Sequence, residues 1–189
     1  MCRCDVWMAK IVSGTDVLLA LLYAKGSTGK NNEPIAGTTK LEKFVFLISR
    51  ETDLKETISK DYDFAPDNYG PCSHEIFDDI EMLKDAKIIV EKEGNIFNPL
   101  DEGDGDFCHY SAIDSGDYPK RKLRIFSLTD KGQTIGEILS NALSPETKKK
   151  IIMLKKVYNK RPVSKIIQNV YTKYPEMIGE SKIKEKVLI

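Results

Sequence analysis

The chain has 189 residues, of which 41% are hydrophobic and 31% are charged, so it is long enough to bury one sizeable core without disulfides or metals. Its formal net charge of zero argues against a protein built mainly to coat nucleic acid. No run approaches the roughly 20 apolar residues that span a bilayer, and residues 1–10 lack a signal-peptide pattern. We therefore expect a cytoplasmic protein without membrane contact.

The charges are distributed unevenly along the chain. Residues 51–106 hold seventeen Asp or Glu against five Lys or Arg, a net of −12. Residues 144–189 hold twelve Lys or Arg against four acids, a net of +8. Such asymmetry indicates an interaction surface, although two solvated charged faces would give the same pattern.

Two helices are predicted in the first quarter of the chain. Residues 15–25 have the apolar spacing of a largely buried helix, which Thr15 or Asp16 would cap. Residues 27–37 are rich in Gly, Asn and Pro and indicate a loop. A second helix begins at Thr38 or Thr39, with an apolar inner face.

A third helix and a β ribbon follow. Residues 61–71 combine aromatics with Pro and Gly and predict a shaped loop. Ser73 would cap a helix that ends near Lys87, and β-branched residues then predict strands at 88–93 and 123–128. The polar segment 98–122 between them indicates a long wing loop. Three helices followed by a ribbon is the winged-helix order, within an α+β fold.

The remaining sequence predicts a helical C-terminal extension. Thr129 or Asp130 would start a fourth helix, Ser144–Pro145 a fifth and Pro162 a sixth. We assign residues 13–142 to a winged-helix-like domain (three helices plus a β-wing) and residues 143–189 to a basic extension that packs on it or forms a homodimer. The lysines of the fifth helix are expected on its outside: Lys148, Lys149, Lys150, Lys155 and Lys156.

Three segments resemble the YwgA-like and Panacea (SocA-type antitoxin) group of small winged-helix proteins. They are Lys40–Leu47, then Phe64-Ala65-Pro66 leading into Tyr69-Gly70-Pro71 with Ser73 and Ile76, and finally Leu128–Gly132. The resemblance implies a regulator or antitoxin that acts by protein contact, while some winged-helix relatives bind DNA. It implies no catalytic residues.

The outward side of the third helix is strongly acidic, because its apolar residues turn to the core. Several carboxylates facing phosphates would be repelled, so this helix suits a basic protein partner better than a DNA groove. The expected protein-contact residues are these acids and the nearby aromatics: Glu75, Asp78, Asp79, Glu81, Asp85, Tyr62, Phe64 and Tyr69.

A DNA-binding transcriptional regulator is the alternative. Cations at the wing root and on the fifth helix suit phosphate contacts: Lys120, Arg121, Lys122, Arg124, Lys148, Lys149 and Lys150. A cluster of lysines is nevertheless also typical of a merely solvated helix face.

Metal and enzyme sites have little support in the sequence. Cys72 with His74 and Cys108 with His109 are weak zinc candidates, because neither pair has the usual ligand spacing. Cys2, Cys4, Cys72 and Cys108 are too scattered for a disulfide framework, so reduced thiols are expected. The Gly26–Lys30 segment fails the phosphate-loop pattern in spacing and context. We expect a non-enzymatic protein without a cofactor.

Overall fold

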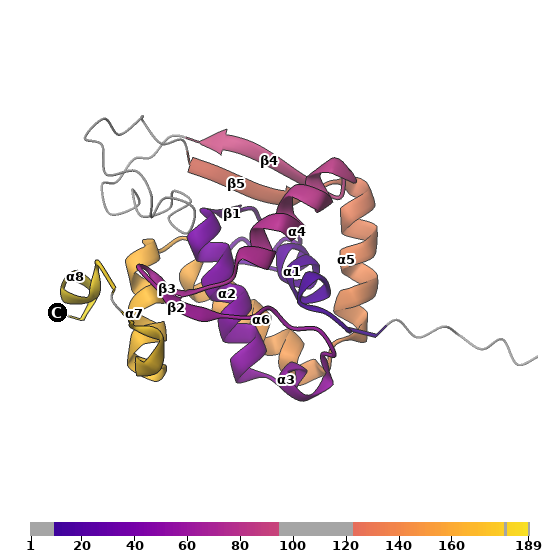
Figure 1. The fold of residues 1–189 in the computed structure, drawn as a ribbon. Helices are drawn as coiled ribbons and strands as arrows, with labels where there is room; N and C mark the ends of the chain where they lie inside the picture. Colours follow the sequence, from indigo (N-terminus) through magenta and orange to yellow (C-terminus); the bar gives the residue numbers. More distant parts are fainter. Residues whose placement is uncertain (1–9, 95–122, 180, 189) are drawn as a thin grey trace, which may run out of the picture.

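The computed structural model describes residues 10–94, 123–179 and 181–188, which form an α+β fold (Figure 1). The first half contains α1 (Gly14–Tyr23), β1 (Ile35–Ala36), α2 (Thr38–Glu51), α3 (Leu54–Thr57), β2 (Ala65–Asp67), β3 (Gly70–Cys72), α4 (His74–Asp85) and β4 (Ile89–Gly94). The second contains β5 (Leu123–Leu128), α5 (Asp130–Ala142), α6 (Pro145–Tyr158), α7 (Val163–Lys173), the 3-10 helix η3 (Pro175–Met177) and α8 (Lys184–Val187).

Helix α2 is the centre of the molecule. It lies in the middle of Figure 1 and packs against α1, α6 and α7 as well as β1 and β3. Every residue from Thr38 to Ser49 is buried, including Lys40, Glu42 and Lys43. The polar groups of this helix must therefore find their partners inside the protein.

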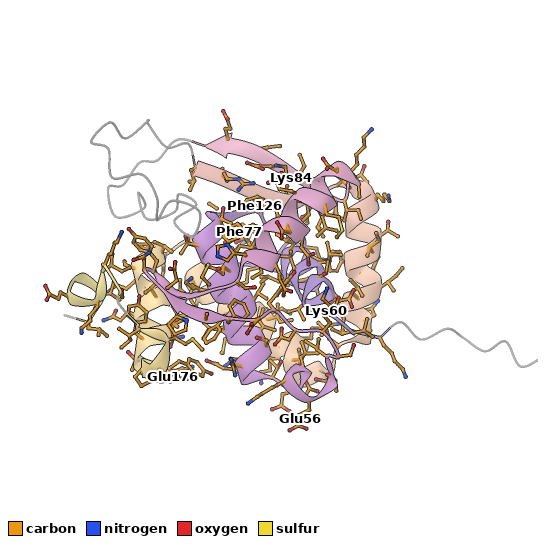
Figure 2. All side chains as sticks on the ribbon, in the orientation of Figure 1. Glu56, Lys60, Phe77, Lys84, Phe126 and Glu176 are labelled. Carbon is orange, nitrogen blue, oxygen red and sulfur yellow. The ribbon has the colours of Figure 1, made fainter. Side chains whose placement is uncertain are left out.

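A small antiparallel sheet with the strand order β1-β5-β4 covers one side of the helices. Ile35 pairs with Phe126, and Ile89 pairs with Leu128, so the buried side chains of the three strands share one face. The predicted strands are present, whereas β1 falls in a segment that was expected to be loop. Phe126 and Phe77 of α4, labelled in Figure 2, are both buried, and Phe126 belongs to the main hydrophobic cluster.

The segment before α4 is more regular than expected. Its residues form an antiparallel hairpin of β2 and β3, in which Ala65 pairs with Cys72 and Asp67 with Gly70. Gly70 has a φ of 91°, a conformation that other residues rarely adopt, and this allows the tight turn.

The C-terminal helices belong to the same hydrophobic core as the rest. Ile151 and Leu154 of α6 and Ile166 and Val170 of α7 are buried in one cluster with α1 and α2. Residues 143–179 therefore complete the burial of α2. None of the helices in the described part of the chain has the length and apolar character needed to cross a membrane.

Lys155 of α6 is fully buried, which corrects its expected place on the outside of that helix. Its Nζ donates hydrogen bonds to the carbonyl oxygens of Leu21 (3.0 Å), Leu22 (2.8 Å) and Ala24 (2.8 Å). The Leu21 carbonyl also accepts from the Ala24 N–H at 3.2 Å. Since the last carbonyls of a helix have few donors within it, the lysine closes α1 and joins it to α6.

Replacing Lys155 by Met should lower the free energy of unfolding by about 1–3 kcal/mol, because the three carbonyls at the end of α1 would lose the donor that Lys155 supplies. Urea denaturation followed by circular dichroism measures the change. Lys156→Met is the matched control, since Lys156 is exposed and its loss should have little effect. Equal stability of the two variants would contradict the role of Lys155.

The same residue predicts a pH dependence. Burial lowers the pKa of Lys155 from 10.5 to about 7, against the opposing charge of Glu33. Between these values the unfolded chain binds a proton that the folded chain has released, so stability rises with pH across this window. The difference in unfolding free energy between the wild type and Lys155→Met should therefore increase from pH 7 to about pH 9.

Candidate functional site

Helix α4 is positioned by a buried ion pair on α2. Lys43 Nζ donates to Glu42 Oε2 and to the carbonyl oxygen of Pro71, both at 2.6 Å, and the backbone N–H of Ser73 donates to Glu42 Oε1 at 2.9 Å. The carboxylate of Glu42 thus satisfies a backbone donor at the start of α4, where the Ser73 side chain forms no capping bond. Burial raises the pKa of Glu42, and Lys43 opposes that rise.

Gly70 completes this junction. A Cβ at this position would lie 3.1 Å from the ring of Tyr171 and 3.5 Å from Cε of Lys43. The absence of a side chain therefore lets α7 and Lys43 pack against β3. The segments that carry the family resemblance, Lys40–Leu47 and Tyr69-Gly70-Pro71, meet here as a structural junction and not as a surface site.

The solvent side of α4 carries a narrow row of exposed residues, which we call the acidic stripe: Glu75, Asp78, Met82 and Asp85. Their spacing of three, four and three residues places them on one helix face. Met82 is 54% exposed near the middle of the row. Within the described residues, the three carboxylates form no ion pair, so the stripe presents uncompensated negative charge.

Asp79 differs from its neighbours because it is tied to the rest of the protein. Its Oδ2 accepts hydrogen bonds from Thr15 Oγ1 and, at 2.6 Å, from the hydroxyl of Tyr62. Burial and the Asp79 carboxylate raise the pKa of Tyr62, so its hydroxyl stays protonated as a donor. Asp79 therefore joins α4 to α1 and is a structural group.

Glu81 is also engaged within the protein. It pairs with Lys84 and Arg124 at 2.7 Å, and Glu91 of β4 binds the same two cations at 2.6 and 2.7 Å. The hydrogen bonds from Arg124 and Lys84 hold the pKa of Glu91 below its usual value. The four side chains link α4 to the ribbon and consume its nearest cations; Lys84 is labelled in Figure 2.

A cavity of about 210 Å³ lies beside the acidic stripe. Four carboxylates and one lysine are among its lining groups, and burial raises the pKa of one of them, Asp61. Such a lining favours a cationic group over an anion. The lining residues are Ser13, Gly14, Thr15, Lys60, Asp61, Tyr62, Glu75, Asp78 and Asp79, of which Lys60 is labelled in Figure 2.

The aromatic residues expected at the contact surface lie mostly inside. Tyr62 and Phe64 are each only 7% exposed, and their rings pack edge to face at 6.2 Å. Phe64 also packs against Phe46 of α2. The expectation that Tyr62 and Phe64 contact a partner is therefore wrong, because both belong to the core. Tyr69 is partly exposed.

Four of the seven cations of the nucleic-acid alternative lie among the described residues, and two of these four are paired with carboxylates. Arg124 is held by Glu81 and Glu91, and Lys150 pairs with Glu51. Lys148 bonds to Asn141, while Lys149 is exposed. The other three predicted residues, Lys120, Arg121 and Lys122, lie outside the described residues.

Of the four weak zinc candidates, the structure describes two, Cys72 and His74. Cys72 is buried and disulfide-bonded, so the expectation of reduced thiols is wrong for this residue and it offers no thiolate. His74 is exposed at the start of α4, and Cys108 and His109 lie outside the described residues. No group of three or more potential metal ligands occurs in the described ranges.

The Gly26–Lys30 segment surrounds an internal carboxylate. Glu33 accepts hydrogen bonds from the backbone N–H groups of Ser27 (3.2 Å) and Thr28 (2.7 Å), from both hydroxyls, and from Asn159 Nδ2 (2.7 Å). Burial opposes ionisation, but these bonds outweigh it and lower the pKa of Glu33 to about 2. The N–H and hydroxyl groups of Ser27 and Thr28, which lie where a phosphate loop would bind its ligand, therefore already bind Glu33.

The acidic stripe includes one residue that the sequence interpretation missed. Met82 follows Asp78 by four residues and precedes Asp85 by three, so the helical period already placed it on the outward face.

Comparison of the chain with family models, curated proteins and solved structures gave no match.

Replacing Lys43 by Met should lower the free energy of unfolding by about 3–5 kcal/mol, because the Glu42 carboxylate would remain buried without its cation. The double variant Glu42→Gln/Lys43→Met should recover part of this loss, since it removes the uncompensated charge. Urea denaturation measures both, with the exposed Lys92→Met as control. A Lys43→Met variant as stable as the control would contradict the claim that the Glu42–Lys43 pair stabilises this junction.

Proposed function

We propose that this chain is a non-catalytic winged-helix module that binds a basic protein partner through the acidic stripe. The order α1, α2, α4 and then the ribbon β4–β5 supports a winged helix, and β1 pairs onto β5 as a third strand. In a winged helix of this order, α4 would correspond to the helix that enters a DNA groove in helix-turn-helix proteins.

The observation that carries this proposal is the uncompensated charge of the stripe. Glu75, Asp78 and Asp85 are exposed, and the nearby cations Lys84 and Arg124 are already paired with Glu81 and Glu91. A phosphate backbone against this face would meet like charges, which costs several kcal/mol. A basic surface gains from the same charges.

Met82 defines the partner further. A flexible thioether that is 54% exposed adapts to irregular apolar surfaces, and Met is enriched in protein interfaces. We therefore infer a partner segment with an apolar anchor flanked by Lys or Arg. The resemblance to the YwgA-like and Panacea group points the same way, toward a regulatory or antitoxin-like protein.

The charge-reversal variant Asp78→Lys/Asp85→Lys should lose its protein partner. Both side chains are exposed, so the fold should be kept. The amount of captured partner should fall tenfold or more, which corresponds to a loss of roughly 1.4 kcal/mol or more in binding free energy. A tagged pull-down from the source cell with quantitative mass spectrometry measures the capture.

The matched control is Glu56→Lys, which reverses an exposed acid on α3 (labelled in Figure 2). It should retain the partner. Full retention by the stripe variant would contradict the proposal, as would equal loss in both.

The alternative function, a DNA-binding regulator, predicts that the protein retards random duplex DNA in a gel-shift. We expect no retardation at low salt, because Arg124 and Lys150 are engaged with carboxylates. Strongly salt-dependent binding that Lys148→Glu/Lys149→Glu abolishes would favour the DNA-binding alternative instead.

A further inference from the structure

A second exposed row of residues lies on α6 and just beyond its end. It consists of Lys149, Met153, Lys156, Val157 and Lys160, which we call the basic stripe. Met153 is 48% and Val157 37% exposed, and within the described residues the three lysines form no ion pair. The spacing of four and three residues places Lys149, Met153 and Lys156 on one face of α6, and Lys160 follows two residues after the end of the helix.

The two stripes are complementary. Each has an apolar centre, Met82 in one and Met153 with Val157 in the other, and charged residues on both sides of it. At about 1.5 Å per residue, the acidic stripe extends over roughly 15 Å and the basic stripe over roughly 16 Å. A row with the chemistry inferred for the partner of α4 is therefore present on the chain itself.

We propose that a second copy of this chain docks its basic stripe on the acidic stripe, so that the protein associates head to tail. The stripes belong to different parts of the fold, since α4 packs on β4 whereas α6 packs on α1, α2 and α7. One copy can therefore use both at once, and such a heterologous contact repeats along a chain of copies unless its rotation closes a ring.

This inference rests on the acidic stripe of the proposed function and adds a regulation to it. Self-association covers the same residues that the basic partner binds, so the two compete. The contact is electrostatic at exposed positions, so salt weakens it. Dilution then exposes the acidic stripe to a partner.

Sedimentation velocity of the full chain tests the proposal. The weight-average mass should rise with protein concentration at about 20 mM salt and return to the monomer at about 500 mM salt. Asp78→Lys/Asp85→Lys and Lys149→Glu/Lys156→Glu should each remain monomeric at low salt. Mixing the two variants should restore association, because each supplies the charge that the other has reversed.

The control Lys182→Glu/Lys184→Glu makes the same change in net charge as Lys149→Glu/Lys156→Glu, at exposed residues of the C-terminal segment that packs on α7, and should associate like the wild type. A wild type that stays monomeric at low salt, or association that survives either stripe reversal, overturns the proposal. Partner capture by Lys149→Glu/Lys156→Glu separates the two ideas: its acidic stripe is intact, so capture upholds the proposed function even if self-association is absent.

Discussion

The burial of α2 from Thr38 to Ser49 is the constraint on which the rest of the structure depends. A helix that is covered on all sides yet carries Glu42 and Lys43 must satisfy their charges internally. The pair does so by binding Pro71 and Ser73, the backbone groups that precede and begin α4. The desolvation of two charges gives little net stability, but it fixes one geometry, since any other arrangement would leave a charge unpaired. The direction of α4, and hence of the acidic stripe, follows from this pair.

The distribution of charge over the surface follows from the same requirement. Near α4, Lys84 and Arg124 are held by Glu81 and Glu91, so these two cations join the helix to the ribbon and form no ion pair with the acidic stripe. On α6, Lys155 closes α1, which leaves the basic stripe on the opposite side of that helix. A chain with zero net charge thereby presents two unneutralised rows of opposite sign.

The helical period predicted α4 and its two faces because Ile76, Phe77, Ile80 and Leu83 recur at the correct spacing, and all four are buried. Lys155 was expected outside because lysine is usually exposed. Its position indicated the opposite, since it lies four residues after the buried Ile151 and therefore on the same helix face. Burial all around α2 has no periodic signal. Strand β1 has only two residues and depends on pairing with β5, about ninety residues later, so no local pattern could reveal it. The aromatics of residues 61–71 indicated a contact surface, but the core takes up Tyr62 and Phe64.

Glu33 shows why polar motifs in this chain mislead when read alone. The Gly26–Lys30 loop has hydroxyl and backbone N–H groups that suit an anion. The anion that they bind is the carboxylate of Glu33, three residues beyond the loop. Asn159 also binds Glu33, and Lys40 donates to the Asn159 carbonyl oxygen, so the loop is joined to both α6 and α2. A bound phosphate would have to displace a group whose pKa is held near 2 by these same donors. The polar groups with strong internal partners therefore belong to the scaffold. The side chains that the scaffold leaves unpaired are the ones available to a binding partner.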